Sequence, residues 1–164
     1  MPRRRTGACL AALAFAATHG AAADRAGYTL AEIDRFGRQL AADRCQRPVE
    51  VKTSFVPTPG DTTSADEMLS IDCRAFKVAV YRARGMSPAR ESPMSVLLVG
   101  AVPGSGAWAV GASASDVRAT LGAPARLFGE NLVYVLPGIE QRDTLVFEVR
   151  AGVVQALSWN WDVD

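Results

Sequence analysis

Histidine is almost missing from this sequence of 164 residues, which contains only His19. His19 lies in an N-terminal segment that we expect to be removed, so the remaining chain has none. This absence excludes Ser-His-Asp triads, histidine general bases and histidine metal ligands. The motifs G-x-S-x-G and S-x-x-K and the Walker loop are missing as well. The sequence therefore predicts a protein that is not an enzyme and that holds no metal or cofactor.

Neither sign of charge is in excess, because 18 Lys and Arg residues stand against 17 Asp and Glu residues. A protein that binds nucleic acid would carry a basic stripe, so we expect no nucleic-acid partner. Apolar residues make up 49% of the chain, which excludes a disordered protein. A chain of this length and composition can form one or at most two small domains with a core.

Long hydrophobic runs are also missing, since Gly7 to Thr18 is only 12 residues long. A membrane-spanning helix needs roughly 20 residues, so we expect no transmembrane segment. Three arginines, Arg3 to Arg5, precede this run, and three alanines, Ala21 to Ala23, follow it. This order is typical of a secretory signal peptide, which predicts cleavage after Ala23 and a periplasmic or secreted mature protein.

Cysteine is scarce, and only Cys45 and Cys73 remain once the signal peptide is removed. An even number of cysteines in an oxidising compartment predicts a disulfide between them, and two separately buried thiols are the alternative. The chain contains no Cys-x-x-Cys sequence, so such a bond would have a structural rather than a redox role.

The first half of the mature chain shows a helix followed by strands. Thr29 and Glu32 have the spacing of a capping box, and apolar residues recur at helical spacing up to about Arg44. A strand is expected over residues 49–55, an exposed loop over 57–67 and a long strand over 69–80. In the last of these the apolar face slips by one residue near Ala75, which predicts a bulge or a bend.

The second half repeats this order with shorter elements. A strand is expected over residues 95–102, and Ser113 with Asp116 predicts a capping box for a helix that ends near Leu121. Three further strands, forming a meander, are expected at residues 132–136, 144–150 and 153–161.

These elements predict an α+β fold in which short helices pack on a mainly antiparallel sheet. The segments that begin at Gly27 and Gly111 share the form G-x-[ST]-x-x-[DE]-[IV], so two tandem helix-then-strands modules are one option. The expected organisation is a signal peptide (1–23), an N-terminal half with the disulfide (24–82), a connector (83–93) and a C-terminal module (94–164).

The aromatic residues of the last strand suggest a contact surface. Trp159 and Trp161 share one face, whereas small residues occupy the other. If a helix packs on the small residues, the tryptophans form an exposed row of the kind that anchors protein partners. The alternative is that they belong to the core, and both interpretations stand. Other candidates for this partner-binding surface are Trp108, Arg126, Phe128 and Tyr134.

A family resemblance covers about Val110 to Trp161. It rests on Gly111-x-Ser113-x-x-Asp116-Val117-x-x-x-Leu121-Gly122-x-Pro124-x-Arg126, then Tyr134, Leu145-x-Phe147 and Gly152-x-Val154. This pattern resembles the SmpA/OmlA (BamE-like) family of small envelope proteins, and it is similar to the repeats of β-lactamase inhibitory protein.

The resemblance implies a non-enzymatic protein-binding module of the cell envelope. In the first form it is an envelope scaffold or a factor related to outer-membrane assembly. In the second form it is an inhibitor or ligand-binding protein of the β-lactamase inhibitory protein type. The second form requires two tandem modules with exposed Trp159 and Trp161, so the placement of these side chains separates the two.

Overall fold

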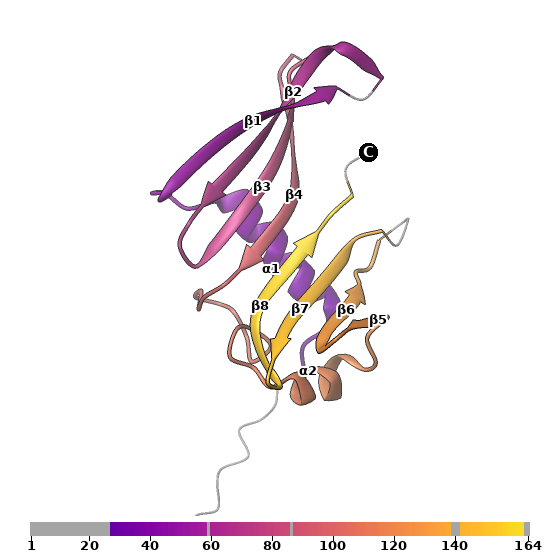
Figure 1. The fold of residues 1–164 in the computed structure, drawn as a ribbon. Coiled ribbons are helices and arrows are strands. Elements are labelled where there is room, and N and C mark those ends of the chain that lie inside the picture. The colour runs from indigo at the N-terminus through magenta and orange to yellow at the C-terminus, as the bar shows by residue number, and fades with distance from the viewer. Residues whose placement is uncertain (1–26, 59, 86, 139–141, 163–164) are drawn as a thin grey trace, which may run out of the picture.

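The computed structural model describes residues 27–58, 60–85, 87–138 and 142–162 (Figure 1). The expected signal peptide, residues 1–23, lies outside these ranges. Two helices are present, α1 (Leu30–Asp43) and α2 (Ala114–Leu121). Eight strands are present: β1 (Glu50–Thr58), β2 (Asp61–Asp72), β3 (Phe76–Ala83), β4 (Arg90–Leu98), β5 (Arg126–Phe128), β6 (Asn131–Val135), β7 (Thr144–Arg150) and β8 (Val153–Asn160).

The strands form one antiparallel sheet in the order β1-β2-β3-β4-β8-β7-β6-β5. The expected α+β fold is therefore wrong, because the described residues form mostly this sheet, with two short helices, and the fold is rich in β-structure. β4 pairs with β8, so the first four strands and the last four join into a continuous sheet (Figure 1). The two halves of the chain therefore share one sheet.

Several segments that look like loops in the sequence are strands. Most of the expected loop over residues 57–67 belongs to the β1–β2 hairpin, whose turn lies between Thr58 and Asp61. Residues 90–93 of the expected connector belong to β4. β4 pairs with β8 only from Ser95 onward, so Pro93 lies on a part of β4 that pairs with β3 alone, where a proline is tolerated.

The slip in the apolar pattern near Ala75 marks a turn between two strands, not a bulge within one. Residues 73–75 connect β2 to β3, and Arg74 has a positive φ of 67°. The amide of Arg74 donates to the Asp72 carboxylate at 2.9 Å, which stabilises the turn. A tight turn and a one-residue bulge both shift the alternation of side chains, so the pattern alone does not separate them.

The core forms on one face of the sheet, where apolar residues lie in register across the strands. Ile71, Val78, Val96, Trp159 and Leu145 occupy successive strands in one row, and all are buried. The indole Nε1 of Trp159 donates a hydrogen bond of 3.1 Å to the carbonyl of Ile33. α1 therefore lies directly on this row, and it spans the junction between the two halves of the sheet (Figure 1).

Close packing of α1 on the sheet depends on Gly37. A Cβ atom at this position would lie 2.7 Å from the ring of Trp159, which is closer than carbon atoms can approach. A glycine in a helix costs about 1 kcal/mol relative to alanine. Here the missing side chain allows the helix backbone to rest on the indole ring.

Both ends of α1 are fixed as the sequence indicates. The expected capping box is confirmed, because Thr29 and Glu32 exchange their hydrogen bonds. Just after the helix, Cys45 forms the predicted disulfide with Cys73, with Cα atoms 5.7 Å apart. The second helix, α2, differs from the expectation, because its N-cap Ser113 accepts from the Ser115 amide.

Candidate functional site

The aromatic residues expected to form a contact surface are mostly buried. Trp108, Tyr134, Trp159 and Trp161 are all in the core, and Trp159 is 0% exposed. Trp108 packs edge to face against Trp159, with ring centroids 6.2 Å apart. Of the two interpretations of Trp159 and Trp161 that the sequence left open, the buried one agrees with the structure, and these four residues form no exposed row.

The physical reason is that α1 covers the tryptophan face of β8 and not the face of small residues. Trp161 donates from Nε1 to the Asp34 carboxylate of α1 at 2.9 Å. The guanidinium of Arg38 lies over the Trp161 ring, 5.1 Å from its centroid. Two buried indoles thus find polar partners on one helix, which lowers the cost of burying their N–H groups.

Tyr134 explains part of the motif that carries the family resemblance. Its hydroxyl donates to the carbonyl of Gly122 at 3.1 Å, and Gly122 ends α2 with a φ of 82°. Such a positive φ favours glycine. The Leu-Gly-x-Pro sequence and the tyrosine therefore have a structural role, because their hydrogen bond holds the end of α2 against β6.

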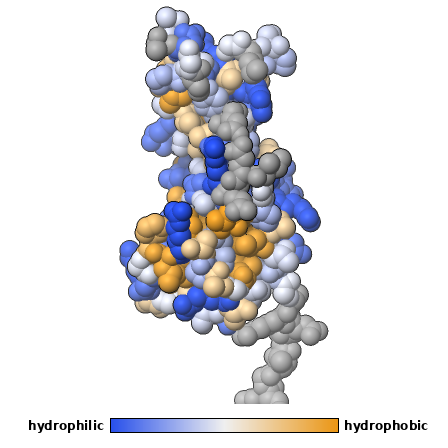
Figure 2. Space-filling view, turned by 90° about the vertical axis from the view of Figure 1, so that its right-hand side faces the viewer, coloured by the Kyte–Doolittle hydropathy of each residue, from blue (hydrophilic) through white to orange (hydrophobic). Residues whose placement is uncertain are grey.

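Arg126 and Phe128 are the two expected contact residues that lie on the surface, and Leu127 lies between them. Together they form β5, the outermost strand, which pairs only with β6. Leu127 is 59% exposed and Phe128 is 64% exposed. We call Arg126, Leu127 and Phe128 the β5 surface. Apolar residues gather over the C-terminal half on the side that Figure 2 shows.

A pocket of about 260 Å³ lies beside the β5 surface. Its lining combines apolar side chains with one charge of each sign, including Arg118, Leu127, Glu130 and Leu132. The pocket is large enough for one or two apolar side chains. Leu127 is the exposed apolar residue that lines it, whereas Phe128 is not among the lining residues. An apolar pocket with a few polar groups is typical of binding sites.

The turn between β5 and β6 holds the β5 surface in place. Gly129 turns the chain with a φ of 61°. The Glu130 carboxylate accepts from the Gly152 amide at 3.2 Å, and the Asn131 side-chain oxygen accepts from the Val149 amide at 2.9 Å. These bonds attach the edge hairpin to β7 and to the β7–β8 turn. Leu127 and Phe128 are therefore presented by a supported strand, and they do not belong to a loop.

The opposite edge of the sheet is also apolar. Val49, Val51 and Phe55 at β1 are exposed, Phe55 by 62%. The alternation of this segment predicted a half-buried strand, and the prediction of a strand is confirmed. Its apolar side chains are on the same face as the core row, since Val51 is opposite Ile71. Sequence alternation shows which residues share a face but not whether anything covers that face.

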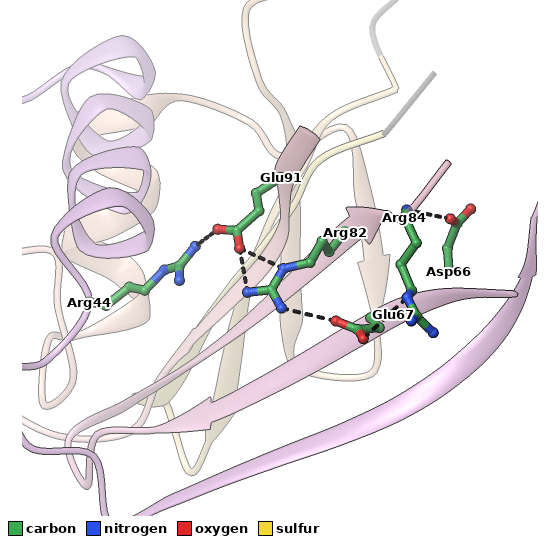
Figure 3. A network of polar contacts seen from close by, with 6 residues as sticks. All are labelled: Arg44, Asp66, Glu67, Arg82, Arg84 and Glu91. Atoms are coloured by element: carbon green, nitrogen blue, oxygen red, sulfur yellow. Dashed lines mark hydrogen bonds and ion pairs between the residues drawn. The ribbon is translucent and has the colours of Figure 1, made fainter. Parts of the chain in front are cut away.

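A chain of ion pairs crosses the α1 face of the sheet beside the core (Figure 3). Glu91 pairs with both Arg44 and Arg82, and Arg82 also pairs with Glu67 at 2.9 Å. Arg84 lies 3.6 Å from the other oxygen of Glu67. Arg44 keeps the pKa of the Glu91 carboxyl below its usual range, and Arg82 adds to this effect. These pairs connect the end of α1 to three strands, so their role is structural.

Asp66, which was expected in a solvated loop, is instead 1% exposed. Its carboxylate accepts from the Tyr81 hydroxyl and, at 2.8 Å, from the Arg84 amide (Figure 3). The hydrogen bond from Tyr81 lowers the pKa of Asp66 most, followed by that from Arg84. The side chain thus connects the β1–β2 hairpin to the end of β3.

The lowered pKa of Asp66 predicts how its contribution depends on pH. Because the folded state favours the ionised form, the contribution is present above the ordinary pKa of 3.8 and disappears as pH falls through the lowered value. We expect Asp66→Asn to lower Tm at pH 7 and the difference from wild type to shrink below about pH 4. Thermal unfolding followed by circular dichroism from pH 7 to about pH 2 measures this. A difference that stays constant over the range would contradict the role of the ionised carboxylate.

No helix in the described ranges is both long enough and apolar enough to cross a membrane. Within the same ranges, no three His, Cys, Asp or Glu residues are grouped as a metal site would require.

Comparison with known proteins finds no family model, no curated protein and no solved structure that matches this chain.

Proposed function

We propose that the protein is a protein-binding module of the cell envelope and that its partner binds at the β5 surface. The observation that carries this proposal is the exposure of Leu127 and Phe128 on opposite faces of an edge strand, with Leu127 lining a pocket. Exposed apolar surface beside a pocket is typical of interaction sites. The fold anchors them, so their exposure does not come from fraying.

The structure also favours a particular mode of binding. β5 leaves one side of its backbone without a neighbouring strand, and its side chains are exposed. An extended segment of a partner can pair with such an edge and insert an apolar side chain into the adjacent pocket. Arg126 at the start of β5 adds a positive charge, which favours an acidic residue at that end of the partner segment.

Of the two forms that the family resemblance implies, we propose the scaffold or the factor related to outer-membrane assembly. The inhibitor form requires exposed tryptophans on β8, and Trp159 and Trp161 are buried. Secretion to the periplasm is part of this proposal and depends on the signal peptide expected at residues 1–23.

The proposal is tested by capture with a matched pair of variants. Immobilised mature protein, residues 24–164, is exposed to detergent-solubilised envelope, and the bound proteins are identified by mass spectrometry. We expect Phe128→Ser to reduce the captured partner by about tenfold or more, as for a central aromatic anchor. Phe55→Ser is the control, because Phe55 is nearly as exposed, also lies on an edge strand and is at the opposite end of the sheet.

The outcomes separate the alternatives. Recovery of outer-membrane proteins or β-barrel assembly components that depends on Phe128 and not on Phe55 supports the scaffold. Recovery of one soluble hydrolase in fixed ratio supports an inhibitor and overturns our choice. Partners that bind Phe128→Ser and wild type equally well would show that the β5 surface is not the site.

A further inference from the structure

The edge formed by β1 has features that the proposed function does not use. β1 is nine residues long, three times the length of β5, and it has a neighbour only on the β2 side. Val49 and Val51 extend the core face outward and remain exposed. On the other face, Glu50 and Lys52 form an exposed ion pair with 2.9 Å between the charged atoms.

An edge of this kind tends to recruit another strand. Natural proteins often protect such edges with a lysine or a proline, and β1 contains both Lys52 and Pro57. Pro57 lies near the end of the strand, however, where it leaves the first half free to pair. Lys52 repels a strand with a positive charge opposite it, but it favours one that places an acidic residue there.

We propose that the occupant of this edge is a second copy of the same chain, paired antiparallel through β1 about a twofold axis at Val51. In this register the Val51 side chains of the two copies meet at the axis. Glu50 of each copy lies opposite Lys52 of the other, which gives two reciprocal pairs of unlike charge. Val49 of each copy lies opposite Thr53, so every pair on the apolar face is β-branched.

Charge selects this register over its neighbours. An axis at Lys52 would place the two lysines directly opposite each other, which is unfavourable. An axis at Thr53 would place Lys52 opposite Ser54 and leave both pairs of unlike charge unmade. An axis perpendicular to the sheet keeps the apolar face of both copies on one side, and the sheet then continues through the dimer.

Charge reversal tests the interface. Sedimentation velocity of the mature protein, at concentrations up to about 1 mM, should show a dimer in equilibrium with monomer. We expect Lys52→Glu to weaken association by about tenfold or more, since two attractive pairs become repulsive. The double variant Glu50→Lys/Lys52→Glu restores the pairs with exchanged signs and should recover the dimer. Phe128→Ser, at the far edge, should leave association unchanged.

Cysteine substitution tests the register. Residues directly opposite each other have Cβ atoms about 4.5–5.5 Å apart, so Val51→Cys should form a disulfide-linked dimer on mild oxidation. Thr53→Cys is the matched control on the same face, because its two copies would be about 13 Å apart in this register. Peptide mapping of both variants verifies that Cys45–Cys73 remains intact.

Three results would overturn the proposal. A wild-type protein that stays monomeric over the whole concentration range has no such interface. A dimer that Lys52→Glu does not weaken, or that the double variant does not restore, uses a different surface or register. Crosslinking through Thr53→Cys in place of Val51→Cys would move the axis to Thr53. All three are independent of Phe128, so they leave the proposed function of the β5 surface untouched.

Discussion

Replacing Trp159 by alanine is expected to lower the free energy of unfolding by about 3–5 kcal/mol. The indole is 0% exposed and packs against Trp108, with α1 resting on it at Gly37. Alanine would leave a large cavity between the helix and the sheet. It would also remove the hydrogen bond to the carbonyl of Ile33. Equilibrium unfolding in urea, followed by far-UV circular dichroism, measures the change.

Phe128→Ala provides the comparison for Trp159→Ala. Phe128 is also aromatic and lies in a strand of the same sheet, but it is exposed. We expect its removal to change stability by no more than about 0.5 kcal/mol. If Trp159→Ala were as mild as Phe128→Ala, Trp159 would not be part of the core and the placement of α1 on β8 would be wrong.

Removal of the disulfide, by the double substitution Cys45→Ala/Cys73→Ala, is expected to cost about 2–5 kcal/mol. The bond joins residues 28 positions apart, and the chain-entropy model gives about 3.6 kcal/mol for a closed loop of this size. The disulfide also fixes the end of α1 to the β2–β3 turn. The ion pair between Arg44 and Glu91 attaches the same end of α1 to a different strand, β4. The same urea unfolding experiment gives the magnitude.

Reduction of the wild-type protein serves as the control for this prediction. The reduced protein and the double variant should have similar stability, because both lack the same crosslink. Mass spectrometry of the secreted protein should detect no free thiol at Cys45 or Cys73. A double variant as stable as the oxidised wild type would mean that other contacts hold the end of α1.

The sequence was informative where one local interaction decides the structure. The capping box of Thr29 and Glu32 and the apolar spacing to about Arg44 were sufficient for α1. An even number of cysteines after the expected signal peptide was sufficient for the disulfide. The last three strands were also found, and a two-residue turn separates the last two of them.

Other elements could not be found because their residues carry weak local signals. β5 has only three residues, and its outward-facing Leu127 and Phe128 resemble the start of a buried segment. The hairpin arms around Thr58 and Asp61 consist of residues common in loops, yet pairing between β1 and β2 makes them strands. Pairing is a long-range interaction, so it can override local preference.

The placement of the tryptophans shows the same limit within one strand. Alternation correctly separated Trp159 from Ser158 and Asn160, but a register shift between β7 and β8 brings Val154 into the core, and alternation did not show which face α1 covers. That choice depends on Gly37, 122 positions earlier in the chain, which offers the helix surface on which an indole fits. Local pattern therefore set α1, most of the strands and the crosslink. Which faces are buried and which edges are open followed only from how distant segments pack, because burial is a property of pairs of surfaces and not of either one alone.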